Sequence, residues 1–185
     1  MADERGKLIL LADISGYTTF VGGTVLDHGR MWTARLLELV AERLATRLGL
    51  SAVEGDALAF YGSDDADHTL LPLLVETYRE FRRVAATIDP CTGCACAACD
   101  SGKDMELKYI AHAGPFVEQI VAGRHQLYGP DVNLAFRLLK NHIPAHHYVF
   151  VTDAAAGLLP LGADAIPHLE TVGTSNVRGH YRILA

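Results

Sequence analysis

Apolar and polar positions along the first third of the chain form blocks that predict strands and one long helix. An apolar run over residues 7–13 ends in Asp13 and predicts a buried strand. Apolar residues at helical spacing over residues 29–48 predict an amphipathic helix, which Gly49 would end. Residues 50–61 predict two short strands joined at a Gly-Asp turn.

The remaining two thirds of the chain continue this alternation. In order, the patterns predict a helix from Asp65 or Asp67 to residue 86, strands over 105–112 and 117–121, a helix over 130–139, a strand over 148–151, a short helix over 154–159 and a strand over 177–184. This order predicts an α+β fold with a mostly antiparallel sheet covered by helices. No repeat or long linker divides the pattern, so residues 1–185 are expected to form one domain.

Composition narrows the class of protein. Half of the 185 residues are hydrophobic, which is normal for a packed core, and no apolar run approaches the length of a membrane span. Residues 1–7 lack the basic and then apolar layout of a signal peptide, so a cytoplasmic protein is expected. The formal net charge of -6 argues against a broad nucleic-acid surface. It is compatible with a nucleotide, because metal ions neutralise a triphosphate locally.

All the cysteines of the chain lie close together. They are Cys91, Cys94, Cys96 and Cys99. In a cytoplasmic chain, such clustering indicates metal ligation rather than disulfides. Two C-x-x-C pairs suit one tetrahedral structural Zn²⁺ within an insert at residues 90–102, and four thiolates would leave no open position for catalysis. A redox-active, iron–sulfur or metal-free loop is the alternative.

Two aspartates stand where predicted strands end. Asp13 follows the first apolar run, and Asp56 stands at the tip of the predicted hairpin. Carboxylates at neighbouring strand ends, beside exposed backbone N–H groups, suit hard divalent cations and the phosphates that these cations carry. An ordinary turn aspartate is the alternative for each of them. Their recurrence in two similar settings favours phosphoryl chemistry.

Three separated motifs carry a family resemblance. They are Ala12-Asp13-Ile14-Ser15-Gly16-Tyr17-Thr18, Glu54-Gly55-Asp56-Ala57-Leu58-Ala59-Phe60 and Tyr128-Gly129-Pro130-Asp131-Val132-Asn133-Leu134-Ala135-Phe136-Arg137-Leu138. In this order they resemble the catalytic domain of class III adenylate and guanylate cyclases, over roughly residues 7 to 152. The Cys-rich insert resembles that of a smaller bacterial subgroup of cyclase-like proteins. The resemblance implies the ferredoxin-like cyclase fold.

The resemblance implies a role for the first two motifs. Asp13, Ile14 and Asp56 would hold two Mg²⁺ or Mn²⁺ ions per site. One ion would activate the ribose 3′-hydroxyl and the other would neutralise the triphosphate. The backbone at the start of the following helix would cradle phosphate oxygens. The residues expected there are Ser15, Gly16, Tyr17 and Thr18.

The third motif is expected to act on the ribose and on the α-phosphate. Asn133 would orient the ribose and Arg137 would stabilise developing charge. The two residues are four apart and share one helical face, which a merely solvated face would also explain. ATP-using members of the family usually carry Lys and Asp at two base-binding positions, which are Ala52 and Gln126 here. The Gln126 amide can still hydrogen-bond a base edge. ATP is expected because it is the more frequent substrate in the family that the chain resembles, with GTP or a pyrimidine triphosphate open.

The resemblance also implies an assembly and an activity. In the family, the aspartates and the Asn/Arg pair serve one site from opposite subunits. Since this chain carries both halves, a head-to-tail homodimer is expected to convert a nucleoside triphosphate into a 3′,5′-cyclic nucleotide and pyrophosphate. A non-catalytic module of the same fold that binds a nucleotide or a protein is the alternative. A metal or redox sensor built on the cysteines is a third hypothesis.

Overall fold

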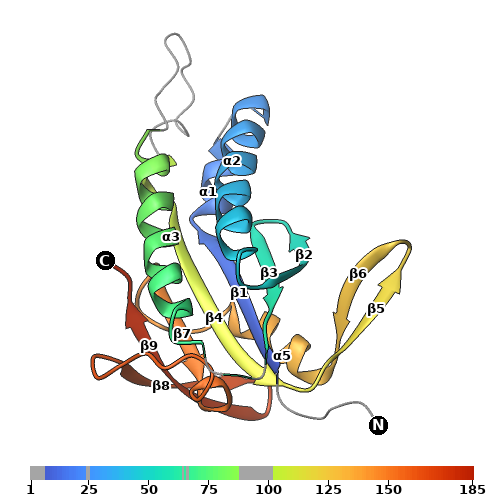
Figure 1. Ribbon diagram of the computed structural model, residues 1–185. Helices are drawn as coiled ribbons and strands as arrows, with labels where there is room; N and C mark the ends of the chain where they lie inside the picture. Colours follow the sequence, from blue (N-terminus) through green and yellow to red (C-terminus); the bar gives the residue numbers. More distant parts are fainter. Residues whose placement is uncertain (1–6, 24–25, 64, 66, 88–101) are drawn as a thin grey trace.

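The computed structural model describes residues 7–23, 26–63, 65, 67–87 and 102–185 (Figure 1). The main sheet has seven strands in the order β2-β3-β1-β4-β7-β9-β8, and β5 pairs with β6 in a separate hairpin. The strands are β1 (Lys7–Ser15), β2 (Gly49–Glu54), β3 (Ala57–Tyr61), β4 (Glu106–Gly114), β5 (Val117–Val121), β6 (Arg124–Tyr128), β7 (Tyr148–Thr152), β8 (Ile166–Val172) and β9 (Ser175–Ile183). The helices are α1 (Tyr17–Gly23), α2 (Leu26–Leu44), α3 (Leu70–Ala85) and α5 (Pro130–Leu138), and the 3₁₀ turns are η1 (Gly102–Asp104) and η2 (Asp153–Ala155).

The main sheet is mostly antiparallel, which confirms the predicted α+β class. β1 pairs antiparallel with β3 on one side and with β4 on the other. The pairing of β4 with β7 is parallel, whereas β9 joins β7 and β8 antiparallel. In the β1–β4 register Asp13 lies opposite Lys108.

Helices cover both faces of the main sheet. Alternate residues of a strand point to opposite faces, so the apolar residues of β1 contribute to a core on each face. Leu8 and Leu10 of β1 belong to a core that includes residues of α2 and α3. Ile9 and Leu11 belong to a second core with Val132, Ala135 and Leu138 of α5. Figure 1 shows α2 and α3 running beside each other along the sheet, with α5 apart from them. No helix in the described ranges is both long and apolar enough to cross a membrane.

Helix boundaries differ from the sequence prediction at several ends. α2 begins at Leu26 and already ends at Leu44, and Gly49 opens β2 instead of ending the helix. The packed ring of Tyr61 leaves no room for a Cβ atom at Gly49, which explains the glycine. The short helix expected over residues 154–159 is only the 3₁₀ turn η2. α1 directly after Gly16 agrees with the turn into a helix that the first motif predicts.

Two strands were not predicted. β6 carries Arg124, His125 and Gln126 in succession, so it has no apolar alternation, and it pairs with β5. β8 is the edge strand of the main sheet and contains Pro167, which sequence patterns disfavour in strands. In both cases tertiary pairing overrides a weak local signal.

Candidate active site

The two predicted metal aspartates lie close together. Asp13 is near the end of β1, and Asp56 stands in the turn between β2 and β3. The N–H of Ile14 donates a hydrogen bond to the backbone carbonyl of Asp56, at 3.3 Å. Burial, and next the negative charge of Asp13, raise the pKa of Asp56 above its usual range. Two carboxylates that influence each other in this way attract a cation.

A lysine that the motifs do not include lies beside this pair. Lys108 of β4 places Nζ 3.1 Å from Asp13 Oδ2, and both side chains are largely shielded, with 17% and 14% exposed. The same ammonium donates to the carbonyl of Leu139, at 3.0 Å. The sequence signal was one lysine in a largely apolar strand. Only the β1–β4 register reveals its partner, so sequence reasoning missed it.

The two aspartates suit a hard cation whose remaining ligands come from water and a bound substrate. Within the described residues, no group of three or more His, Cys, Asp or Glu side chains is arranged to hold a metal ion. Mg²⁺ commonly takes only one or two carboxylates and completes its shell with water and phosphate oxygens, so two aspartates suffice. The side chain of Ile14 is buried in the core, so this residue could contribute only its backbone.

The predicted phosphate-binding residues form the turn between β1 and α1. Ser15 is the last residue of β1, and Gly16 adopts a positive φ of 86°, which favours glycine. Tyr17 and Thr18 open α1, with the N–H of Phe20 bonded to the Gly16 carbonyl. Tyr17 also lines a cavity of about 330 Å³ together with Gly55, which precedes Asp56. The first and second motifs therefore meet in space.

The other predicted site residues gather in one groove of about 720 Å³, on the face of the main sheet opposite to α2 and α3. Ala52, Gln126, Asn133 and Arg137 all line it, although they come from three distant segments. Its remaining lining residues are Ile9, Ser51, Glu54, Ala59, Leu127, Pro130, Val132 and Phe136. This volume is typical of a site for a small molecule. Asp13 and Asp56 are not among the residues that line this groove.

α5 presents Asn133 and Arg137 to this groove because its other face is buried. Val132, Ala135 and Leu138 pack into the sheet, while the Asn and the Arg are exposed. No ion pair joins Arg137 to a carboxylate among the described residues. An exposed, uncompensated guanidinium in a groove is suited to an anionic ligand.

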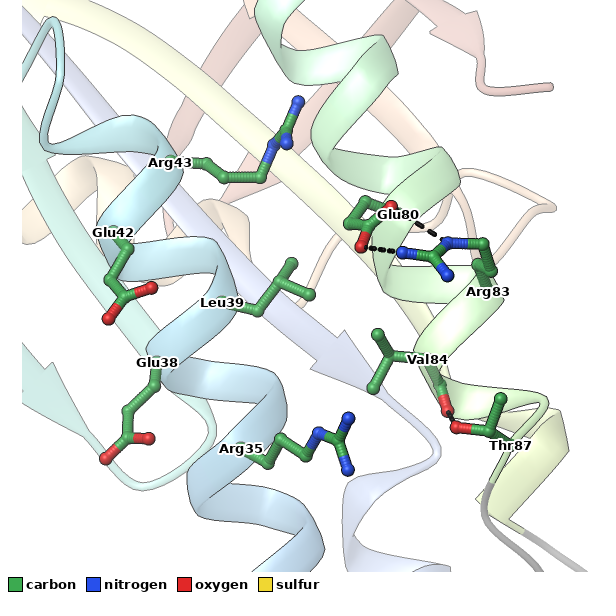
Figure 2. Close-up of a pocket in the computed structure, with 9 residues that line it drawn as sticks. All are labelled: Arg35, Glu38, Leu39, Glu42, Arg43, Glu80, Arg83, Val84 and Thr87. Carbon is green, nitrogen blue, oxygen red and sulfur yellow. Dashed lines mark hydrogen bonds and ion pairs between the residues drawn. The ribbon is translucent and has the colours of Figure 1, made fainter.

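A second groove, of about 450 Å³, lies between α2 and α3 (Figure 2). It has as many arginines as glutamates, and none of the motif residues. The charged residues are Arg35, Glu38, Glu42, Arg43, Glu80 and Arg83. Arg83 is paired with Glu80, and Arg43 Nη2 lies 3.7 Å from Glu76 Oε2. Since its charges balance, this groove does not favour a triphosphate.

The four cysteines predicted to bind zinc lie outside the described residues. Cys91, Cys94, Cys96 and Cys99 therefore remain a prediction, as does the likeness of this insert to a bacterial subgroup.

Comparison with known sequences places the chain near proteins without an assigned activity. A family described as "Protein of unknown function (DUF2652)" matches residues 33–148. The "Uncharacterized protein Rv2561/Rv2562" of Mycobacterium tuberculosis (strain ATCC 25618 / H37Rv) is 33% identical over an alignment of 130 residues that covers 68% of this chain. The match spans 59% of the length of that relative.

Comparison with solved structures finds cyclases. The adenylyl cyclase CyaB from P. aeruginosa aligns with a TM-score of 0.75 at 13% identity, over 99% of this chain and 95% of that one. The guanylate cyclase domain of RhGC from Catenaria anguillulae in complex with GTP aligns with a TM-score of 0.64 at 15% identity, over 100% of both chains. The guanylyl cyclase Cya2 has a TM-score of 0.67 at 14% identity, over 99% and 94%. At such low identity these alignments show the fold alone, and they confirm the predicted cyclase fold.

Proposed function

The chain belongs to the family described as protein of unknown function (DUF2652), and we propose from its site that it is a nucleotidyl cyclase. The proposed reaction converts a nucleoside triphosphate, with ATP expected, into a 3′,5′-cyclic nucleotide and pyrophosphate. The observation that carries the proposal is the groove in which Gln126, Asn133 and Arg137 meet. Core packing does not explain why these three residues lie together. They are the residue types that a base, a ribose and an α-phosphate, in that order, would contact.

In the proposed reaction the ribose 3′-oxygen attacks the α-phosphorus, and the bond from that phosphorus to the bridging oxygen of pyrophosphate breaks. Arg137 would stabilise the charge that develops on the α-phosphate, and Asn133 would hold the ribose in position. A donor placed where charge develops lowers the barrier more than it stabilises the bound substrate. The exposure and the unpaired charge of Arg137 leave it available for this role.

Asp13 and Asp56, with the backbone of Ile14, would hold Mg²⁺ or Mn²⁺ at the proposed site. Such ions assist deprotonation of the 3′-hydroxyl and neutralise the triphosphate. Burial, and next the negative charge of Asp13, raise the pKa of Asp56. A bound cation would relieve the repulsion between the two carboxylates, which supports the assignment. Ser15 to Thr18, in the turn after Asp13, would contact the phosphates.

The proposed active unit is a head-to-tail homodimer. Asp13 and Asp56 do not line the groove that contains Asn133 and Arg137, so neither set makes a complete site by itself. A second copy related by a two-fold axis would join the aspartates of one protomer to the groove of the other, twice. Two equivalent sites follow from that symmetry.

Base selection would rest on Ala52 and Gln126. Both line the groove, and the Gln126 amide can donate and accept hydrogen bonds, whereas Ala52 offers only its methyl group. This pair would select one base less strongly than two charged base-binding side chains would. It also favours a second candidate function, which is a module of the same fold that binds a nucleotide without turnover.

The test is an assay of purified protein with Mn²⁺ and each of the four ribonucleoside triphosphates, with cyclic product identified by mass. We expect a cyclic nucleotide with at least one of them, and none from Asp13→Ala. Nucleotide binding without product in the wild type would favour the non-catalytic module. Neither binding nor product with any triphosphate would overturn both functions.

A further inference from the structure

β4 contacts both ends of α5 through two polar side chains. Lys108 and His112 are four residues apart on one strand, so they point to the same face of the sheet. The Lys108 ammonium donates to the carbonyl of Leu139, which caps the C-terminal end of α5. At the other end, His112 Nε2 lies 3.1 Å from Asp131 Oδ1 in the first turn of the helix.

The spacing of these two contacts matches the length of the helix. Four residues of a strand span about 13 Å, and the eight residues from Asp131 to Leu139 rise about 12 Å along a helix. His112 is buried, and its Nδ1 lies 2.8 Å from Thr152 Oγ1 of β7, so this end is fixed to the sheet. The helix that carries Asn133 and Arg137 is therefore held at each end by β4.

The two ends differ in what else they touch. At the C-terminal end, the Lys108 ammonium is shared between the Leu139 carbonyl and the Asp13 carboxylate, at 3.0 and 3.1 Å. With 17% and 14% of their side chains exposed, Lys108 and Asp13 are partly desolvated, which strengthens their electrostatic interaction. A positive side chain at a helix C-terminus is also favoured by the helix dipole.

We infer that Lys108 is a positioning residue that couples cation binding at Asp13 to the C-terminal end of α5. The inference rests on the proposed function, since it concerns the cation site proposed there. In the cation-free protein the Lys108 ammonium compensates the aspartate pair and holds the Leu139 carbonyl. A divalent cation at Asp13 competes with that ammonium, so binding of the cation loosens the attachment of α5.

The first consequence is on cation affinity. Without the lysine charge, no side chain in the described part of the chain forms an ion pair with Asp13 or Asp56, so the two aspartates should bind an added cation more tightly. Lys108→Met retains an apolar stem of similar length and removes the charge. We expect it to bind Mn²⁺ about tenfold more tightly than the wild type. Binding is measured by the electron paramagnetic resonance signal of free Mn²⁺, without nucleotide.

Three further variants serve as controls for the Mn²⁺ titration. Lys140→Met removes a charge from an exposed residue next to Leu139 and should bind Mn²⁺ as the wild type does. Lys108→Arg keeps the charge and should keep the weaker affinity, which separates charge from packing. Asp13→Asn should abolish binding. Thermal unfolding without Mn²⁺ identifies any variant that has not folded.

The second consequence is on α5 itself. Hydrogen exchange of the amides at its C-terminal end, including those of Leu139 and Lys140, should become about tenfold faster when Mn²⁺ binds to the wild type, because the Lys108 contact is lost. In Lys108→Met the exchange should be fast with and without Mn²⁺. Exchange near Asp131, where His112 holds the helix, should not change in either protein.

The outcomes separate this inference from the proposed function. Tighter Mn²⁺ binding by Lys108→Met alone, with exchange at α5 sensitive to Mn²⁺ only when the lysine is present, supports it. The coupling is overturned, while the cyclase proposal stands, if the wild type and Lys108→Met bind Mn²⁺ equally well. The same holds if hydrogen exchange at α5 does not change when Mn²⁺ binds. If the wild type binds no Mn²⁺ without nucleotide, the coupling is overturned, and the assay for cyclic product decides the cyclase proposal separately.

Discussion

Arg137 is the side chain on which the chemistry of the proposed site depends most. It projects from the exposed face of α5 into the groove, four residues after Asn133, and no carboxylate among the described residues neutralises it. A guanidinium without an ion-pair partner has the positive charge and the parallel N–H donors that bind a phosphate. Its position on a helix with a buried opposite face makes its placement precise.

Replacing Arg137 by Ala should lower kcat by about 10²–10³, because a donor to transition-state charge is lost. The loss should fall mainly on kcat, with KM changed little, in steady-state assays with Mn²⁺. Arg83→Ala is the control, since it removes a guanidinium from α3 on the other face of the sheet. An Arg137→Ala protein with wild-type kcat would remove this residue from the reaction.

The base-binding positions give a second prediction at this scale. Ala52→Lys combined with Gln126→Asp places the charged pair that the resemblance associates with ATP into the same groove. We expect the ratio of kcat/KM for ATP over GTP to rise about tenfold relative to the wild type. Competition assays with both triphosphates measure the ratio. An unchanged ratio would show that these residues do not contact the base.

Sequence motifs located most of the candidate residues, because each motif is a strand end or a helix turn in which local chain geometry places the side chain. Asp13, Asp56, Asn133 and Arg137 were accessible in this way. Lys108 was not, since its importance comes from the β1–β4 register and from the end of α5. Contacts between segments far apart in the chain leave no local pattern.

The same limit holds for secondary-structure elements. Runs with strong periodicity, such as β1, α3 and α5, were predicted close to their observed positions. β6 and β8 were missed because pairing with a neighbouring strand holds them despite polar residues and a proline. α2 ended earlier than predicted, since apolar residues at helical spacing continued into the turn before β2.

β8 nevertheless has a structural role next to the proposed site. Glu170, which is only 3% exposed, accepts a hydrogen bond from the N–H of His142 at 2.8 Å. Its carboxylate also contacts the rings of His142 and His168, at 2.8 and 3.1 Å. Burial alone would raise the pKa of Glu170, but these hydrogen bonds outweigh it and lower the pKa. The ionised carboxylate thus fixes the loop that follows α5.

This contact predicts a pH dependence of stability. A lowered pKa in the folded state means that Glu170 contributes stability above its ordinary value of 4.5, which is lost as the pH falls through the folded pKa. Glu170→Gln should therefore cost about 2 kcal/mol of unfolding free energy at pH 7, and this cost should shrink as the pH falls below 4.5 and through the folded pKa. Thermal unfolding of both proteins across this range measures the difference, and a gap that widens toward acid would contradict the assignment.

At the scale of the molecule, exposed apolar residues mark the surface that a second copy would cover. Ile120 and Tyr128, in the β5–β6 hairpin that extends away from the main sheet (Figure 1), are 67% and 65% exposed. On the neighbouring β2, Val53 is 58% exposed. The base of the hairpin is fixed, because Tyr61 donates to Glu118 and stacks edge-on with Phe116. A fixed hairpin with exposed apolar residues beside the groove supports the proposed homodimer.

The direct test of the whole account is a mixture of two inactive variants. Asp13→Ala lacks the cation half of the site, and Arg137→Ala lacks the groove half. If each site takes one half from each protomer, a mixed dimer has one intact site, and an equal mixture should recover about a quarter of wild-type activity. Recovery to that level, with each variant inactive alone, is the predicted result. No recovery after subunit exchange has been verified would contradict a site shared between two copies.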